Sequence, residues 1–352
     1  MIEALDTDAQ RRQVLLAPQR HALRSHRTAW AADAAHGASV GLGGLLYGGC
    51  AKGHANPVIG NVPLPLLGST TPMLDTWLGH GAATVGTNAH GARWQHDGDW
   101  LFGIIDVPED AGLEAAAGHA YAGLFDALHI TGFTQLLRVW NYLPRINEEG
   151  NAMERYRRFN AGRQQAFLDA GERAFEGSPA ACAIGSADGP LSVCFLAGRG
   201  AVRHIENPRQ VSAYHYPQRY GPRAPTFSRA AMCAVGEGRL GLFVSGTASI
   251  VGHESVHRGD VRAQVRETVA NLQAVLDTAS SKSSARWSLR DLHGVVYVRH
   301  AHDHAAVLDE LGRVAPDLAR NAGEMVFLHA DICRRELDVE IEGHAWAKGE
   351  LV

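Results

Sequence analysis

The sequence lacks long apolar runs, paired cysteines and an excess of positive charge. Its 352 residues contain no apolar window of about eighteen residues, so no transmembrane helix is expected. The N-terminus, MIEALDTDAQRRQ, is polar and carries both signs of charge, which argues against a secretory signal. The five cysteines are scattered without a CxxC pair, which favours free thiols and a cytoplasmic location. The net charge of −4 predicts no nucleic-acid partner.

Motifs for phosphate binding and for a serine nucleophile are also missing. The glycine-rich stretch Gly41-Leu42-Gly43-Gly44 fits neither GxGxxG nor a P-loop. Ser245 and Ser249 lie in a glycine-containing segment, but no GxSxG elbow surrounds them. An anionic small molecule would therefore have to be bound by a few well-placed arginines rather than by a phosphate loop.

Hydrophobic residues make up 45% of the chain, and their spacing predicts a mixture of strands and helices. Residues 100–107 (WLFGIIDV) and 136–144 are typical of strands. Residues 110–130, 151–171 and 261–276 have the spacing of helices. Gly162 is expected to interrupt the second of these helices.

The C-terminal third alternates in the order β–α–β–α–β–β, which predicts an α+β fold with helices packed on one face of a sheet. We expect an N-terminal α/β region over residues 1–150 and a C-terminal region over residues 151–352. The functional pocket is expected between the two regions.

The segment His253-Glu254-Ser255-Val256-His257 matches the HExxH zinc pattern. That pattern binds zinc only on a helix, which places both imidazoles on one face. Here Gly252 precedes it, and Asp260 has the position of an N-cap for the next helix. We expect a surface or site-lining loop, and we keep a zinc hydrolase as an alternative that a metal analysis separates.

One predicted helix carries Tyr156, Asn160 and Arg163 at spacings that share one face. Such a face either lines a polar pocket or is solvated. The Tyr-rich segment from Gln210 to Arg229 contains three prolines and cannot be a regular helix. Its tyrosines and arginines either form the wall of a site or an aromatic plug over the core.

The last predicted strand carries Glu336, Asp338, Glu340 and Glu342 at alternate positions, so all four are expected to share one face. An exposed acidic face is the usual explanation for such a row. A buried carboxyl in the row would instead have a raised pKa and would act as a general acid at neutral pH.

These segments resemble two related groups of proteins. The blocks VSGTASIVG, GDVRAQVRETVANLQAVL and VEIEGHAWA look like the Rid (YjgF) fold. The blocks RVWNYLPRIN, ERYRRFNAGRQQAF, ENPRQVSAYHYPQRYGP and ADICRRELDVEIEG resemble the chorismatases over roughly residues 135 to 345. The resemblance implies a Rid/chorismate-mutase-like mixed sheet, with the Rid-like part over about residues 224–352.

The resemblance also implies an activity, which is the cleavage of chorismate with release of pyruvate and without metal or organic cofactor. Chorismate would be held and protonated by a set of side chains that the family pattern places as follows: carboxylate clamps Arg163 and Arg229; pocket tyrosines Tyr156, Tyr216 and Tyr220; general acid Glu340, with Glu342 as the fallback.

Two further positions are implied to decide the ring product, Ala248 in SGTAS and Cys333. The resemblance associates a cysteine at position 333 with hydroxybenzoate formation and an alanine, rather than a glycine, at position 248 with hydrolysis. The two positions of this chain therefore predict different products. We expect 3-hydroxybenzoate, with 4-hydroxybenzoate as a further product, and keep hydrolysis to the dihydroxycyclohexadiene carboxylate as the alternative. A Rid-type imine deaminase is kept as a further hypothesis. The protein is expected to be a monomer or a homotrimer.

Overall fold

The computed structural model describes residues 22–30, 41–51, 56–80, 82–150, 153–319 and 325–352. The N-terminal segment MIEALDTDAQRRQ, from which we predict no secretory signal, lies outside this part of the chain. Among the described residues, no helix combines the length and the apolar character needed to cross a membrane.

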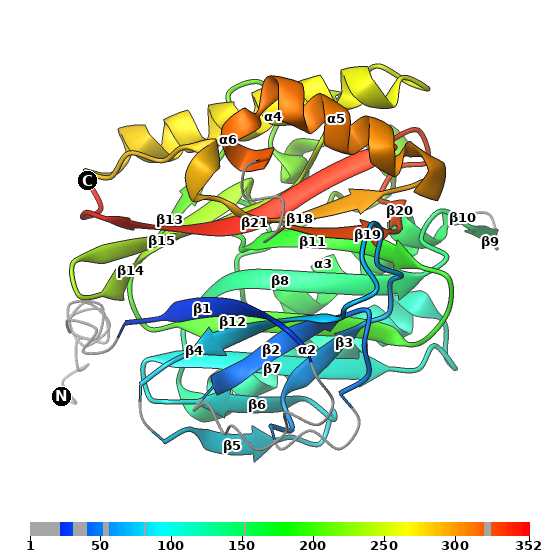
Figure 1. Ribbon diagram of the computed structural model, residues 1–352. Coiled ribbons are helices and arrows are strands. Elements are labelled where there is room, and N and C mark those ends of the chain that lie inside the picture. The colour runs from blue at the N-terminus through cyan, green and yellow to red at the C-terminus, as the bar shows by residue number, and fades with distance from the viewer. Residues whose placement is uncertain (1–21, 31–40, 52–55, 81, 151–152, 320–324) are drawn as a thin grey trace, which may run out of the picture.

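Three β-sheets make up most of the described structure (Figure 1). The first is a four-stranded sheet with the order β1 (Arg24–Ala29), β4 (Met73–Leu78), β2 (Gly41–Tyr47) and β3 (Ile59–Val62). Its strands pair antiparallel except β2 and β3, which are parallel. Strand β2 is buried along its whole length, which explains its run of leucines and glycines.

The second sheet has seven strands and is covered on one face by two helices, α2 (Leu113–Thr131) and α3 (Arg155–Asp169). Only β8 and β11 pair in parallel. The order of the sheet is β20 (Asp331–Ile332), β11 (Ala180–Ser186), β8 (Gln135–Pro144), β12 (Leu191–Gly198), β7 (Trp100–Val107), β6 (Arg93–His96) and β5 (Thr84–Thr87).

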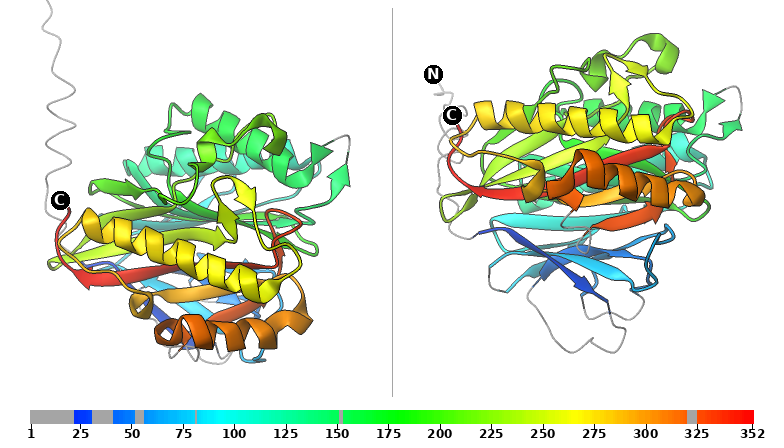
Figure 2. Two further views of the ribbon diagram at one scale, coloured as in Figure 1. Left: turned by 90° about the horizontal axis from the view of Figure 1, so that it is seen from above. Right: turned by 45° about the horizontal axis from the view of Figure 1, so that its top comes forward.

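The third sheet has six strands and carries α4 (Val261–Ser281), α5 (His304–Val314) and the short α6 (Pro316–Ala319) on one face (Figure 2). Its order is β13 (Val202–Ile205), β14 (Ala230–Gly236), β15 (Arg239–Ala248), β21 (Val339–Lys348), β18 (His293–Val298) and β19 (Val326–His329). Two two-stranded ribbons complete the strands: β9 (Glu149–Gly150) with β10 (Met153–Glu154), and β16 (Ile250–Val251) with β17 (Glu254–Ser255).

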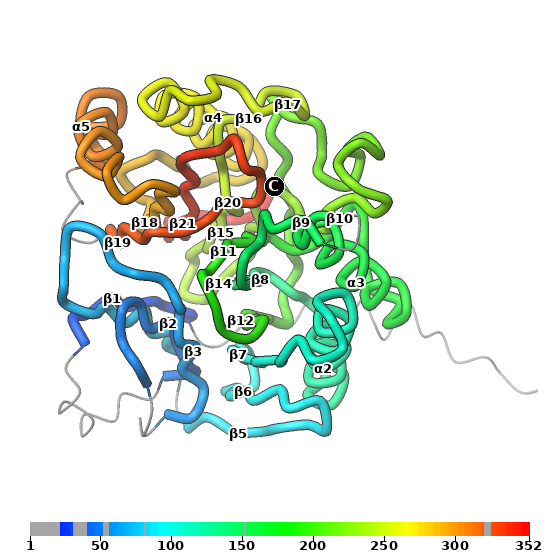
Figure 3. The backbone as a smooth tube through the Cα atoms, turned by 90° about the vertical axis from the view of Figure 1, so that its right-hand side faces the viewer, coloured from blue at the N-terminus to red at the C-terminus, as the bar shows by residue number. Residues whose placement is uncertain are grey.

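The three sheets share one apolar core, which lies on the faces that the helices leave uncovered. Trp77 of β4, Trp140 of β8 and Phe243 of β15 meet there, with ring centroids 5.7 Å apart for the two tryptophans and 6.0 Å for Trp77 and Phe243. Figure 3 shows the blue four-stranded sheet beside the seven-stranded sheet and below the six-stranded sheet. Each of the two larger sheets is therefore buried on both faces, which is why most of their strands are continuously apolar.

The expected α+β class, with helices on one face of the C-terminal sheet, is confirmed. The described residues before position 113 form strands and no α-helix. The seven-stranded sheet takes strands from both sides of residue 150, and the expected division of the chain runs through it.

Helix α3 is not interrupted at Gly162. The glycine lies where α3 contacts α2, since a Cβ there would be 2.0 Å from the carbonyl oxygen of Glu114. A close approach of two helices, rather than a break in one, explains the residue.

Candidate active site

The last strand, β21, places Glu340 on the core side of the six-stranded sheet. Only Glu340 and Glu342 of the acidic row share that face, because the strand begins at Val339. Asp338 precedes it and accepts a hydrogen bond of 2.8 Å from the Gln264 side chain of α4. The prediction that all four acids share one strand face is therefore wrong.

The Glu340 carboxyl is buried, with only 3% of the residue exposed. Burial, and next the charge of Glu342, raise its pKa to about 8, although Arg138, Arg229 and Arg299 act in the opposite direction. A carboxyl with this pKa is protonated at neutral pH and can donate its proton, which is the property of a general acid.

Cys333 and Ala248 both lie next to this carboxyl. The Cys333 sulfur is 4.0 Å from Glu340 Oε2. Ala248 of β15 pairs in register with Glu340, just after an irregularity in the ladder between Val244 and Thr247. Burial raises the pKa of the Cys333 thiol to about 12, so the sulfur is a neutral thiol. The two residues can shape the space around the acid without adding charge to it.

Helix α3 contributes Tyr156, Asn160 and Arg163, all of which are buried. The predicted shared face is thus a buried one. The Arg163 guanidinium lies 5.7 Å from the ring centroids of Tyr121 and Phe159. Its Nε and the Asn160 Oδ1 make no hydrogen bond within the described part of the chain. Burial, and next the Cys333 thiol, raise the pKa of Tyr156, which therefore remains a phenol that can donate a hydrogen bond.

The Tyr-rich segment supplies further side chains of the candidate site. Arg229 donates hydrogen bonds to the Tyr216 hydroxyl at 2.8 Å and to the Val211 carbonyl oxygen at 2.9 Å. The rings of Tyr216 and Tyr220 are 5.5 Å apart. The buried Nε of Arg229 has no hydrogen-bond partner among the described residues. Its charge acts directly on Glu340 and lowers the pKa of that carboxyl.

A third arginine, Arg334, belongs to the same cluster and was missed in the sequence. Its guanidinium lies 4.1 Å from the Tyr220 ring centroid and 5.1 Å from that of Tyr216. Nη1 donates to the His253 carbonyl oxygen at 2.8 Å, whereas the buried Nη2 has no acceptor in the described residues. The available signal was its place next to Cys333 in the block ADICRRELDVEIEG.

The loop that carries Cys333 and Arg334 is held by Arg299, at the end of β18. Arg299 donates to three backbone carbonyl oxygens of this loop, at 2.7 Å to Leu337, 3.0 Å to Ile332 and 2.9 Å to Arg334. It also pairs with the Asp331 carboxylate. A guanidinium used in this way fixes the loop, and with it the position of the thiol beside Glu340.

The cluster therefore combines one protonated carboxyl with three guanidinium groups, each of which has a buried N–H that finds no acceptor among the residues that the structure describes. A buried donor left unpaired costs about 1–3 kcal/mol, which a ligand oxygen would recover. Guanidinium groups bind carboxylates through paired hydrogen bonds. The arrangement suits a ligand with carboxylate groups and a neighbouring atom that accepts a proton.

Comparisons with known proteins show the family of the chain. A family model described as the N-terminal part of the FkbO/Hyg5-like chorismatases matches residues 75–197. A 3-hydroxybenzoate synthase from Streptomyces hygroscopicus is 40% identical over 288 residues, which cover 77% of this chain and 81% of that protein. The chain belongs to the chorismatase family.

Two further relatives carry the family name. A chorismatase from Streptomyces rapamycinicus is 38% identical over 278 residues, covering 76% of this chain and 81% of the relative. The crystal structure of a chorismatase matches with a TM-score of 0.80 and 28% identity, covering 94% of this chain and 100% of the other. The family resemblance and the shared fold thus extend over most of the chain.

In this family member, the HESVH segment does not form a helix. Glu254 and Ser255 form β17, which pairs with β16 in a short hairpin. The Tyr220 hydroxyl donates to the His253 carbonyl oxygen at 2.7 Å, and Arg219 pairs with Glu254. The expected N-cap is confirmed, since the Asp260 carboxylate accepts from the Ala263 N–H. The segment anchors the Tyr-rich wall and lacks the helical register that HExxH zinc sites use.

Proposed function

We propose that the protein cleaves chorismate to pyruvate and 3-hydroxybenzoate, with Glu340 as the general acid. The observation that carries the proposal is the buried Glu340 carboxyl, whose pKa of about 8 keeps it protonated at neutral pH beside guanidinium groups with unused N–H donors. The family supports the same assignment, since one relative is named as a 3-hydroxybenzoate synthase.

Chorismate carries two carboxylates, one on the ring and one on the enolpyruvyl ether, and each needs a cationic partner in a buried site. Arg163 and Arg229 are assigned as the two clamps, and Arg334, which shares the Tyr216 ring with Arg229, adds a third donor. Tyr156, Tyr216 and Tyr220 form the walls, which exclude water and orient the ring.

Glu340 would transfer its proton to the methylene carbon of the enolpyruvyl group, which gives an oxocarbenium ion and leaves a carboxylate. In the intramolecular route the ring's own hydroxyl displaces pyruvate, and aromatisation returns a proton to the enzyme. No atom is then gained, because pyruvate and hydroxybenzoate together contain the atoms of chorismate. In the alternative route a water molecule attacks, and the products are pyruvate and the dihydroxycyclohexadiene carboxylate.

Cys333 and Ala248 are assigned as the residues that choose between these routes. Both lie beside the acid, with the Cys333 sulfur 4.0 Å from Glu340 Oε2 and Ala248 paired with Glu340 in the sheet. A side chain at either position changes the room for water next to the reacting ring. The thiol favours 3-hydroxybenzoate, with 4-hydroxybenzoate as a minor product, whereas the methyl group of Ala248 favours hydrolysis.

The proposed reaction requires only a proton donor and electrostatic stabilisation, so we assign it no metal or organic cofactor. The protein would act on its small-molecule substrate in the cytoplasm, in keeping with its five free cysteines. A monomer and a homotrimer are both compatible with a site built within one chain, and the molar mass in solution distinguishes them.

The test is incubation with chorismate, with pyruvate measured by a coupled assay and the ring product identified by chromatography. Glu340→Gln keeps the shape of the side chain but removes the acid, so we expect about a 10²–10⁴-fold loss of kcat with the fold retained. Wild-type protein that releases no pyruvate would disprove the proposed function. A fully active Glu340→Gln variant would mean that another residue is the general acid. A loss of activity on chelation would support the zinc-hydrolase hypothesis.

A further inference from the structure

Glu342, two residues after the acid on the same strand face, is the most deeply buried carboxylate near the site, with 1% of the residue exposed. It forms an ion pair with Arg138, and both side chains are 2% exposed. The Tyr297 hydroxyl donates to Glu342 Oε1 at 3.0 Å. Burial, and next the charge of Glu342, raise the pKa of Tyr297, so its hydroxyl stays protonated and keeps donating.

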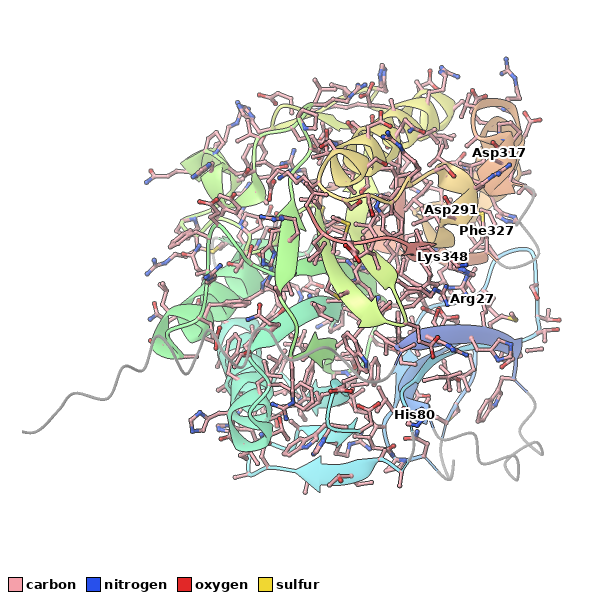
Figure 4. The ribbon with its side chains drawn as sticks, turned by 90° about the vertical axis from the view of Figure 1, so that its left-hand side faces the viewer. Arg27, His80, Asp291, Asp317, Phe327 and Lys348 are labelled. Carbon is pink, nitrogen blue, oxygen red and sulfur yellow. The ribbon has the colours of Figure 1, made fainter. Side chains whose placement is uncertain are left out.

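The ion pair joins two sheets. Arg138 belongs to β8 of the seven-stranded sheet, and Glu342 to β21 of the six-stranded sheet. Both line a small cavity in the shared core, together with Trp77, His344 and the ion pair of Arg27 and Asp75. Arg27 of β1, labelled in Figure 4, reaches the Gly294 carbonyl oxygen of β18 at 2.8 Å.

A buried ion pair seldom adds to the stability of a core, because apolar side chains of similar volume often give equal or greater stability. Stability alone therefore does not account for Arg138 and Glu342. Their place does suggest a role: Glu342 contacts a guanidinium and a phenol, and it lies two residues from Glu340 on the same strand face.

The charges around Glu340 oppose one another. Arg229, before β14, Arg299, at the end of β18, and Arg138 all favour the ionised carboxylate. Glu342 is the strongest charge acting the other way. Burial raises the pKa of two thiols that interact with Glu340, Cys182 of β11 and Cys333 of the loop after β20, so both are uncharged. Tyr297 of β18 pairs in register with Glu340, and its raised pKa likewise keeps it uncharged.

We propose that Glu342, fixed by Arg138 and Tyr297, is a positioning residue that keeps Glu340 as a neutral acid despite the arginines that bind the substrate. The proposal rests on the proposed function, because it explains how one site holds both carboxylate-binding cations and a protonated carboxyl. It also explains why two acids occupy alternate positions of β21 although only one would transfer a proton.

The test is the pH at which Glu340 ionises, measured in two ways. Infrared titration follows the absorption of the protonated carboxyl, assigned to Glu340 by subtracting the spectrum of a matched Glu340→Gln variant. The kcat/KM for chorismate is then measured against pH. In Glu342→Gln we expect both midpoints to fall by roughly one to two pH units, because the anion is lost while Arg138 keeps its charge.

The double variant Arg138→Met/Glu342→Gln serves as the second arm. It removes both charges, so we expect a smaller fall than in the single variant, and it avoids an unpaired buried cation that could unfold the protein. The control is Asp75→Asn, which breaks the other ion pair of the same cavity. Its thermal stability is expected to fall while the midpoint of Glu340 stays in place.

Unchanged midpoints in Glu342→Gln and in the double variant, with chorismate still cleaved, would overturn the positioning role and leave the proposed function intact. Absence of chorismate cleavage in the wild type together with the expected infrared shift would overturn the function and leave the coupling intact. Equal shifts in the single and double variants would also count against the proposal, since Arg138 would then have no electrostatic part in it.

Discussion

A methyl group at position 246 would lie 1.9 Å from Oε1 of Glu340. Gly246 lies at the irregularity of β15 between Val244 and Thr247, where the strand bends next to β21. β-Bulges often lie beside active sites, where they redirect a side chain. The glycine in SGTAS thus leaves the space that the Glu340 carboxyl occupies.

Gly246→Ala should therefore displace the Glu340 carboxyl and reduce kcat by about 10²-fold, since a shift of about 1 Å can have that effect. The measurement is pyruvate release at saturating chorismate, with circular dichroism to confirm the fold. Gly118→Ala on α2 is the matched control, because a Cβ there meets no atom within 4 Å. That variant should keep full activity, and an equal loss in both would contradict the explanation.

The activity should fall with increasing pH through about 8. The proposed acid, Glu340, has a pKa of about 8, so the form that can donate a proton is lost as the carboxyl ionises above that value. The logarithm of kcat/KM should decline by about one for each pH unit on this limb. A profile that rises through pH 8 would mean that the carboxyl acts as a base instead.

Replacing either clamp by lysine keeps the charge but removes the forked donor. We expect Arg163→Lys and Arg229→Lys each to lower kcat/KM by about 10–100-fold, mainly through a higher KM, because paired hydrogen bonds to a carboxylate are lost. Steady-state kinetics with chorismate measures the effect. Arg313→Lys, at an exposed position of α5 with a side chain 68% exposed, should behave as wild type.

The ratio of the two ring products should change when either Cys333 or Ala248 is replaced. Cys333→Ala should raise the share of the dihydroxycyclohexadiene carboxylate, and Ala248→Gly should lower it relative to 3-hydroxybenzoate. Chromatography of the ring products at equal pyruvate release gives the ratio directly. An unchanged ratio in both variants would remove these residues from product choice, whatever their effect on rate.

Much of the secondary structure could be predicted because it depends on local periodicity. The strand predicted over residues 100–107 is β7, and the helix predicted over residues 261–276 forms most of α4. The segment from Gln210 to Arg229 forms no α-helix, as its prolines indicate; it has two short 3₁₀ turns, Ala213–His215 and Gln218–Tyr220. The acidic row was misjudged because the pattern does not show where β21 begins.

The candidate site was only partly visible in the sequence. Tyr156 and Arg163 lie on one face of a predicted helix, and Glu340 follows Cys333 within one resembling block, so local spacing and family resemblance were enough to propose them. Arg334 was missed because its role depends on stacking against Tyr220, more than one hundred residues earlier in the chain. Nothing in the spacing of Arg138 indicates a partner on another sheet.

The sequence by itself determined the class of fold, the family and the residue types available for acid chemistry, because these follow from composition, periodicity and resemblance. Only the tertiary structure decided how the surroundings of the two carboxyls on β21 differ. Glu340 and Glu342 are equivalent in the pattern of β21, yet Glu342 meets Arg138 and Tyr297, whereas Glu340 faces Gly246 and Cys333. Burial and neighbouring charge, which arise when distant strands pack together, separate two residues that a strand pattern treats alike.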